Sequence, residues 1–190
     1  RSDIPILGDI PGPGVRTGNM PDKQINANDI LDFKLSEESN TFIPVPKIEF
    51  FESVENGDIL IMDDGRIRLR VIEKGKDYVK VIALTKGIIK SHKSIDILYK
   101  DYNLPIIEKI DKEAIVFSKE NGIDLIGLSH VRSKKDVIEV KEFLKDIDYN
   151  PKLVAKIESK SGLDNLEEIA EEVDYIMVAR GDLGMSFDLN

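Results

Sequence analysis

Short apolar runs alternate with amphipathic stretches from Ile106 to the end of the chain. Continuous apolar runs of four to eight residues are typical of parallel strands that are covered on both faces. The runs predict strands near 123–128, 152–157 and 174–179, and a similar run near the start predicts one at 4–10.

Between these strands the apolar positions recur every three or four residues, as they do along one side of a helix. A first helix is expected to begin near Asp111 and to end at Gly122, which suits a C-terminal cap. A second follows Ser133 and Asp136, which have the spacing of a capping box. A third is expected over 162–173, as one helix. Its apolar stripe would consist of Leu163, Leu166, Ile169, Ala170 and Val173. The alternation predicts right-handed crossovers and a parallel sheet.

The segment 15–102 has a different pattern, with short runs that partly alternate between apolar and polar residues. Gly-containing turns at 63–66 and 73–77 join these runs, which is the pattern of β-hairpins. We therefore expect a small antiparallel, barrel-like β unit. The expected organisation is a first visible α/β strand at 1–14, the inserted β unit at 15–102, and the continuation of the α/β domain at 103–190.

Composition and charge limit the functional classes. The chain has 190 residues, of which 41% are hydrophobic and 33% charged, as in soluble globular proteins. It contains no cysteine, which excludes disulfides and thiolate metal sites. Neither a membrane span nor a signal peptide is expected. The net charge of -9 argues against a nucleic-acid partner.

The number of strands is small for a closed α/β barrel. Four α/β strands are expected, whereas an eight-stranded barrel needs about 250 residues. The sequence therefore predicts either a compact open sheet or part of a larger fold.

Three charged residues lie at or just after the carboxyl ends of two consecutive predicted strands. Lys156 and Glu158 are two residues apart, so they share a face of their strand, roughly 6.6 Å apart. Asp182 follows the next strand, beside Gly181. Active sites form at this end of parallel strands. Two carboxylates suit Mg²⁺ or Mn²⁺, and a lysine suits a phosphate or a developing anion. The alternative is a structural salt bridge at the strand end, with Asp182 as a turn residue.

The segment "KLVAKIESKSGLDNLEEIAEEVDYIMVARGDLG" closely resembles the pyruvate kinase pattern, in which a strand ending AKIE precedes a helix and IMVARGDLG. Further segments are similar to that family in the same order: "DIPGPGVRTG" to "DtKGPeIRTG", "DILIMDDGRI" to "..lliDDG.i", and "ENGIDLIGLSHVRSKKDV" to "ENGvDfIa.SFVR...DV". The resemblance covers essentially the whole chain. It implies part of a TIM (β/α)8 barrel with an inserted small all-β barrel domain.

The resemblance also implies an activity, the transfer of a phosphoryl group from phosphoenolpyruvate to ADP, which gives pyruvate and ATP. Lys156 would stabilise the transferring phosphoryl group. Glu158 and Asp182 would bind Mg²⁺ or Mn²⁺, and Asp182 and the Gly181 backbone would bind the substrate, with Ala179 and Arg180 nearby. The nucleotide would be bound by Arg16 and Lys93, and K⁺ by Asp9 and the Ile10 carbonyl. The parent would be a cytoplasmic homotetramer.

Several positions depart from the family pattern. Ile10 stands where the family usually has Thr, and Gly14 where it often has Glu, which leaves potassium dependence open. The segment "KSIDIL" after His92 differs from the usual Lys-Gly-Val-Asn-Leu-Pro. The family's Phe before Val-Arg is His130, for which we expect a packing or hydrogen-bonding role. We expect His92 to be solvated.

The family's first two and last two barrel strands have no counterpart here. The chain is therefore expected to be a fragment that is inactive alone. Two alternatives stay open. One is a Mg²⁺-dependent pyruvate-enolate aldolase or lyase of the related barrel superfamily, which an aldol-cleavage assay would detect. The other is a non-catalytic binding module.

Overall fold

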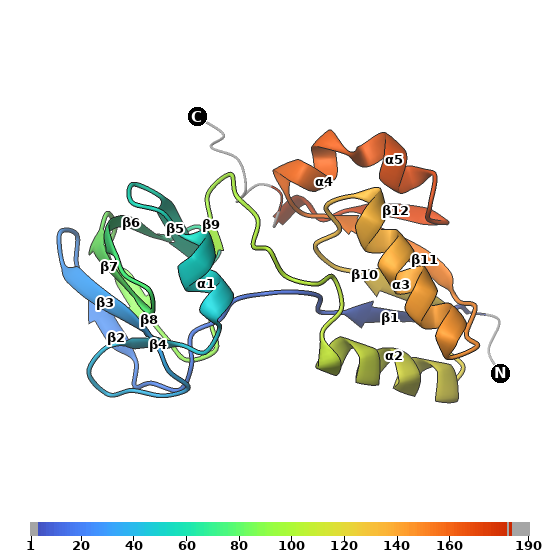
Figure 1. Ribbon diagram of the computed structural model, residues 1–190, viewed down its shortest axis with the longest axis horizontal. Coiled ribbons are helices and arrows are strands. Elements are labelled where there is room, and N and C mark those ends of the chain that lie inside the picture. Colours follow the sequence, from blue (N-terminus) through green and yellow to red (C-terminus); the bar gives the residue numbers. More distant parts are fainter. Residues whose placement is uncertain (1–3, 182, 184–190) are drawn as a thin grey trace. The chain divides into compact units, whose positions relative to one another are not determined.

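The chain forms two compact units, each with its own hydrophobic core. The computed structural model describes residues 4–181 and residue 183. One unit contains the chain up to Pro13 and from Pro105 onward, and the other is Gly14–Leu104 (Figure 1). We describe each unit by itself.

The first unit is built on a curled sheet of parallel strands (Figure 1). Its strands, in spatial order, are β1 (Leu7–Ile10), β10 (Leu125–Leu128), β11 (Lys152–Ile157) and β12 (Tyr175–Val178). Every neighbouring pair is parallel. The four strands expected from the apolar runs and their parallel pairing are therefore confirmed, and the fold of this unit is α/β.

Helices follow these strands along one face of the sheet. They are α2 (Lys109–Glu120), α3 (Lys134–Asp146), α4 (Lys160–Asp164) and α5 (Leu166–Ala170). The prediction of one helix over 162–173 is wrong, because the chain leaves helical geometry at Asn165. The Asn165 side-chain amide donates a hydrogen bond to the carbonyl oxygen of Arg132 at 2.9 Å. This contact with a distant loop lies at the break between the two helices. Leu163 and Ala170 are exposed rather than part of an apolar stripe.

The ends of α2 and α3 are held in different ways. Gly122 has a φ of +63°, as expected for a glycine just beyond a helix. At the start of α2, the buried Asp111 accepts hydrogen bonds from the backbone N–H groups of Glu108 at 2.8 Å and Gly12 at 3.2 Å. The capping box predicted for α3 is wrong, because the Ser133 side chain makes no cap hydrogen bond.

The residue expected to complete that capping box binds a different partner. Asp136 accepts hydrogen bonds from the backbone N–H of Arg132 at 2.8 Å and from its guanidinium at 2.9 Å. Arg132 therefore takes the place of Ser133 as the donor to the Asp136 carboxylate, and the charge of its guanidinium strengthens the contact.

The two faces of the sheet differ in burial. Ile10, Leu128 and Ala155 lie in one register row and belong to the core beneath the helices. On the opposite face Asp9 is exposed. The expectation of strands covered on both faces is wrong for β12, where Tyr175 is 54% and Val178 56% exposed. Within the described residues, β12 is an edge strand that pairs only with β11.

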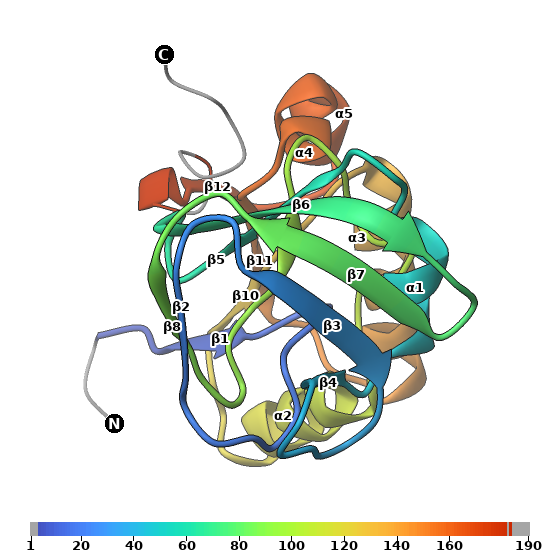
Figure 2. The same cartoon turned by 90° about the vertical axis from the view of Figure 1, so that its left-hand side faces the viewer.

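The second unit is a β unit with one short helix, α1 (Ile48–Ser53). Its larger sheet contains, in order, β4 (Ile43–Val45), β3 (Ile30–Leu35), β7 (Tyr78–Ala83), β6 (Ile67–Lys74), β5 (Ile59–Met62) and β9 (Asp96–Ile97). A smaller sheet pairs β2 (Lys23–Ile25) with β8 (Gly87–Ile89). Figure 2 shows β3, β7 and β6 side by side.

Both predicted hairpins of the β unit are confirmed. The turn between β5 and β6 places Asp63, Asp64 and Gly65 at positive φ, and the other hairpin joins β6 to β7. The pairing is not entirely antiparallel, because β3 and β4 run parallel. The core of this unit packs the aromatic rings of Phe33, Phe50 and Phe51.

None of the helices in the described part of the chain has the length and apolar character needed to cross a bilayer.

Candidate active site

The end of β11 carries the two charged side chains that the sequence singled out. Lys156 Nζ lies 3.1 Å from Glu158 Oε1, so the two side chains share a face of the strand as predicted. Ile157, between them, points the other way into the core beneath the helices. Because side chains alternate along a strand, Ile157 packs in the core while Lys156 and Glu158 lie on the opposite face.

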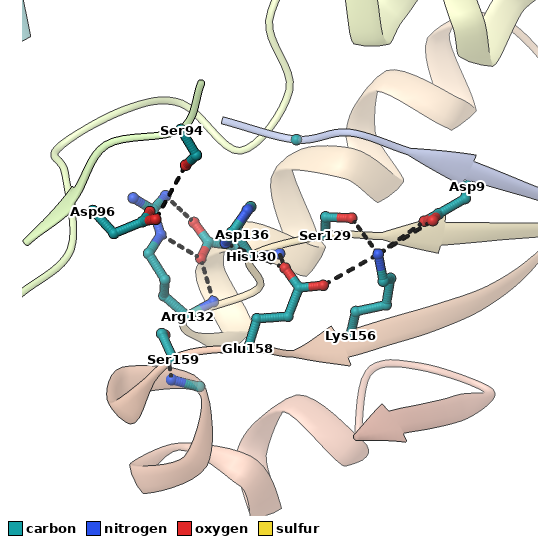
Figure 3. Close-up of polar contacts among 12 residues, drawn as sticks. Asp9, Ser94, Asp96, Ser129, His130, Arg132, Asp136, Lys156, Glu158 and Ser159 are labelled. Atoms are coloured by element: carbon teal, nitrogen blue, oxygen red, sulfur yellow. Dashed lines mark hydrogen bonds and ion pairs between the residues drawn. The ribbon is translucent and has the colours of Figure 1, made fainter. Parts of the chain in front are cut away.

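Lys156 is held by side chains from two neighbouring strand ends (Figure 3). Both carboxylate oxygens of Asp9 on β1 lie 3.2 Å from its Nζ, and Ser129 Oγ, just after β10, lies at 2.8 Å. Gly127 is the register partner of Asp9 on β10. A Cβ at this glycine would lie 3.2 Å from Asp9 Oδ1, so the missing side chain leaves room for the carboxylate.

The charge of Lys156 is stabilised by these contacts. Its side chain is only 15% exposed, and this burial by itself lowers the pKa of the ammonium. The Glu158 carboxylate and then the Asp9 carboxylate more than offset that effect, and the net pKa of Lys156 is raised above 10.5. The site therefore presents a fixed positive charge at neutral pH.

Glu158 is nearly buried, with 2% of its side chain exposed. Its Oε2 accepts a hydrogen bond from the backbone N–H of His130 at 2.9 Å, and the Nδ1 of the same residue lies 3.2 Å away. The backbone N–H of His130 and the contact of Oε1 with Lys156 compensate the desolvation of this buried carboxylate. The expected hydrogen-bonding position of His130 is thus supported by its distance from Glu158.

No group of three or more His, Asp or Glu side chains that could hold a metal ion occurs among the described residues. Glu158 supplies a hard carboxylate oxygen of the kind that Mg²⁺ or Mn²⁺ prefers. The second expected ligand, Asp182, lies outside the described residues. The carboxylate of Glu158 therefore fits the donor chemistry of such a cation.

The two predicted nucleotide-binding cations lie on adjacent segments of the β unit. Arg16 pairs with Ser94 as an antiparallel bridge, and its guanidinium donates to the carbonyl oxygen of His92 at 3.1 Å. The backbone carbonyl of Lys93 accepts a hydrogen bond from Thr17 N–H at 3.0 Å. Arg16 and Lys93 are both exposed, so this edge presents two positive side chains to solvent.

The remaining expected site residues are less closely connected. Gly181 is exposed, and no residue that the structure describes lies within 4 Å of a Cβ built on it. The Ile10 side chain is buried in the core, so its backbone carbonyl is the only group it could offer a cation. Of the residues expected in the α/β unit, the structure brings together Asp9, Lys156 and Glu158.

Sequence reasoning missed Ser129, and it assigned no partner to His130. Ser129 follows Gly127 by two residues at the end of β10, so the strand period alone places it on the face that carries Asp9 and Lys156. The period could therefore have identified the serine. The approach of His130 to Glu158 depends on a backbone turn that the strand pattern does not indicate.

The sequence and the fold both match known proteins. The family profile described as "Pyruvate kinase, barrel domain" matches residues 1–189. Pyruvate kinase of Pyrobaculum aerophilum is 35% identical over 190 residues, which cover 98% of this chain and 41% of that protein. Pyruvate kinase of Thermococcus litoralis is 36% identical over 190 residues, which cover 98% of this chain and 40% of that protein.

A solved structure described as pyruvate kinase from Pyrobaculum aerophilum superposes with a TM-score of 0.88 at 35% identity. The match covers 98% of this chain and 42% of that one. The chain spans about two fifths of the length of these curated relatives. With a profile match along nearly its whole length, the chain belongs to the pyruvate kinase family.

Proposed function

We propose that the protein to which this chain belongs transfers the phosphoryl group of phosphoenolpyruvate to ADP and gives pyruvate and ATP. The observation that carries this proposal is the position of Lys156, whose ammonium lies among Asp9, Ser129 and Glu158 at the carboxyl ends of three adjacent parallel strands. Phosphoryl transfer depends mainly on positioning and charge neutralisation, which such a cation provides.

Each group has a role in this proposal. Lys156 neutralises charge on the transferring phosphoryl group, because its ammonium is fixed and its pKa is raised. Glu158 and Asp182 hold Mg²⁺ or Mn²⁺, which supplies Lewis-acid stabilisation of the enolate when bound. Asp182 and Gly181 also bind the substrate.

The nucleotide and monovalent-cation roles are assigned to other parts of the chain. Arg16 and Lys93 bind the nucleotide phosphates. This assignment is supported by their side chains, which are exposed and lie on adjacent segments. Asp9 and the Ile10 carbonyl bind K⁺. Asp9 faces the Lys156 ammonium, so K⁺ binding requires Asp9 to coordinate beside an existing cation.

The proposal extends to the architecture. The curled four-stranded sheet would be part of a (β/α)8 barrel, with domain limits at 1–14 and 103–190. The β unit, 15–102, would be an inserted β-barrel domain. The complete protein would be a homotetramer of the cytoplasm.

Substitution of Lys156 tests the proposed reaction. In the full-length protein, Lys156→Met should lower kcat for pyruvate formation by about 10²- to 10³-fold or more, because it removes a charge that stabilises the transition state. A coupled assay of pyruvate release measures this change. Thermal unfolding of the variant checks that it folds.

Lys152→Met is the matched control. Lys152 lies on the same strand at its opposite end, where its Nζ contacts Asp174 Oδ1 at 2.7 Å. This variant removes a paired lysine far from the rim and should keep near-normal turnover. Near-normal turnover in Lys156→Met itself would refute the role of Lys156.

A further inference from the structure

His130 approaches Glu158 with two of its nitrogen atoms. Its backbone N–H donates to Glu158 Oε2 at 2.9 Å, and its Nδ1 lies 3.2 Å from the same oxygen. This convergence depends on a φ of +57° immediately after β10, a left-handed conformation that is uncommon for residues other than glycine. The backbone of His130 thus adopts an unfavourable conformation in which the residue contacts the buried carboxylate of Glu158.

The residue type matters for this contact, because the sequence at this position reads "SHVR" and places an imidazole beside Glu158. A phenylalanine would keep the backbone N–H but would have no ring donor. The imidazole adds one that can reach Glu158.

We propose that His130 is a positioning residue, which holds Oε2 of Glu158 through its backbone N–H and its Nδ1–H together. The two oxygens of this carboxylate then have different partners. Oε2 is held by His130, and Oε1 faces the Lys156 ammonium at 3.1 Å. The carboxylate is thereby fixed in rotation, with Oε1 directed toward the side of the site that carries Lys156.

This inference rests on the proposed role of Glu158 as a ligand of the divalent cation. Residues that hydrogen-bond a metal-binding side chain orient it, and their loss typically weakens metal affinity about 10- to 100-fold. The contact also has a defined protonation pattern. A carboxylate oxygen accepts hydrogen bonds, so the proposed contact requires a proton on Nδ1 of the His130 ring.

The first test measures Mn²⁺ affinity of the full-length protein by electron paramagnetic resonance titration. His130→Gly keeps the backbone N–H, suits the positive φ and removes the imidazole. We expect it to weaken Mn²⁺ binding about 10- to 100-fold, while the free energy of unfolding does not decrease. His130→Phe, which keeps an aromatic ring but has no ring nitrogen, should weaken binding similarly. His130→Asn keeps a side-chain donor in a residue that tolerates this conformation, so it should restore part of the affinity.

His92 provides the control for the backbone conformation. It also has a positive φ, of +59°, and its side chain is exposed in the β unit. The same changes, His92→Gly and His92→Phe, should leave Mn²⁺ affinity unchanged. Equal losses at His92 and His130 would contradict a specific effect on Glu158.

The second test identifies the proton on the ring by ¹⁵N spectra of histidine-labelled protein at alkaline pH. We expect His130 to be an Nδ1–H tautomer, and Glu158→Leu to shift it toward Nε2–H because the acceptor is removed. An Nε2–H tautomer in the unmodified protein would overturn the proposal.

The outcomes also separate this inference from the proposed function. If Glu158→Gln weakens Mn²⁺ binding but His130→Gly does not, the positioning role of His130 is wrong and the ligand role of Glu158 stands. If Glu158→Gln leaves Mn²⁺ affinity unchanged, the ligand role itself is wrong.

Discussion

Gly12 shows how a single residue supports the rim of the sheet. Its φ is +70°, and a Cβ added to it would lie 2.7 Å from the backbone carbonyl oxygen of Ser129. Its N–H donates to the buried Asp111 at the start of α2. The loop after β1 can therefore approach the loop after β10 only because this position lacks a side chain.

Gly12→Ala should lower the free energy of unfolding by about 1–3 kcal/mol, because alanine meets both the unfavourable φ and the close carbonyl. Urea unfolding followed by circular dichroism measures the change. Gly14→Ala is the matched control, since none of residues 4–181 or 183 lies within 4 Å of a Cβ built there. Equal losses in both variants would show that the close contact at Gly12 has no specific effect.

Part of the site was predictable at this scale. Lys156 and Glu158 were identified because two residues along a strand share a face, and the structure places Nζ and Oε1 at 3.1 Å. Their burial and the approach of His130 were not predictable, because both depend on loops that are distant in sequence. The alternative interpretation was a salt bridge at the strand end, and the ion pair between Lys156 and Glu158 is present there. The turnover of Lys156→Met decides whether Lys156 also takes part in catalysis.

At the scale of elements, ion pairs connect α3 to the loop that follows α5. Glu172 in that loop contacts the Nζ atoms of Lys134 and Lys141, both at 2.6 Å. The hydrogen bonds from Lys134 and then Lys141 lower the pKa of Glu172 from 4.5 to about 2. These pairs lie at the surface, so salt screens them.

The lowered pKa predicts a pH dependence of stability. A carboxyl group whose pKa is depressed by folding contributes stability above its unfolded pKa, and this contribution is lost as the pH falls through the folded pKa. Between pH 4.5 and about 2, the free energy of unfolding should therefore decrease more steeply in the unmodified protein than in Glu172→Gln. Urea unfolding across this pH range, at low salt, measures the difference.

Glu142→Gln is the control for that experiment, because Glu142 is an exposed glutamate on α3, the helix to which Glu172 is connected. Its pH dependence should match that of the unmodified protein. If Glu172→Gln also matches, the ion pairs of α3 do not contribute measurably to stability.

The elements themselves differ in how far the sequence determines them. Hairpins such as the one joining β5 and β6 were predictable because the turn residues are local signals. The break at Asn165 was not, because it depends on a hydrogen bond to Arg132 in another loop. The exposure of β12 likewise depends on its place at the sheet edge, whereas its apolar sequence indicated burial.

At the scale of the whole molecule, the chain has two separate hydrophobic cores. The core of the β unit includes Phe33, Phe50 and Phe51, and that of the α/β unit includes Ile115 and Leu128. A unit with its own core can fold independently. The covalent chain connects the units at 13–14 and 104–105.

The segment 14–104 should therefore fold when produced alone. We expect cooperative thermal unfolding and dispersed amide resonances, because its buried residues pack mainly on one another. Phe50→Ala should destabilise it by about 3–5 kcal/mol, since Phe50 is fully buried. Replacement of the exposed Ile88 by alanine is the control and should have little effect. An unfolded segment would contradict the independence of this core.

The four contacts around Lys156 have a consequence for how an anion would bind. A free lysine loses about 1.5–2 kcal/mol of rotamer entropy when its side chain becomes ordered. Here Asp9, Ser129 and Glu158 already order it during folding. The Lys156 ammonium would already be ordered when a phosphate binds, and it would only exchange one of these partners for the phosphate. Little conformational entropy of the side chain would therefore be lost on binding.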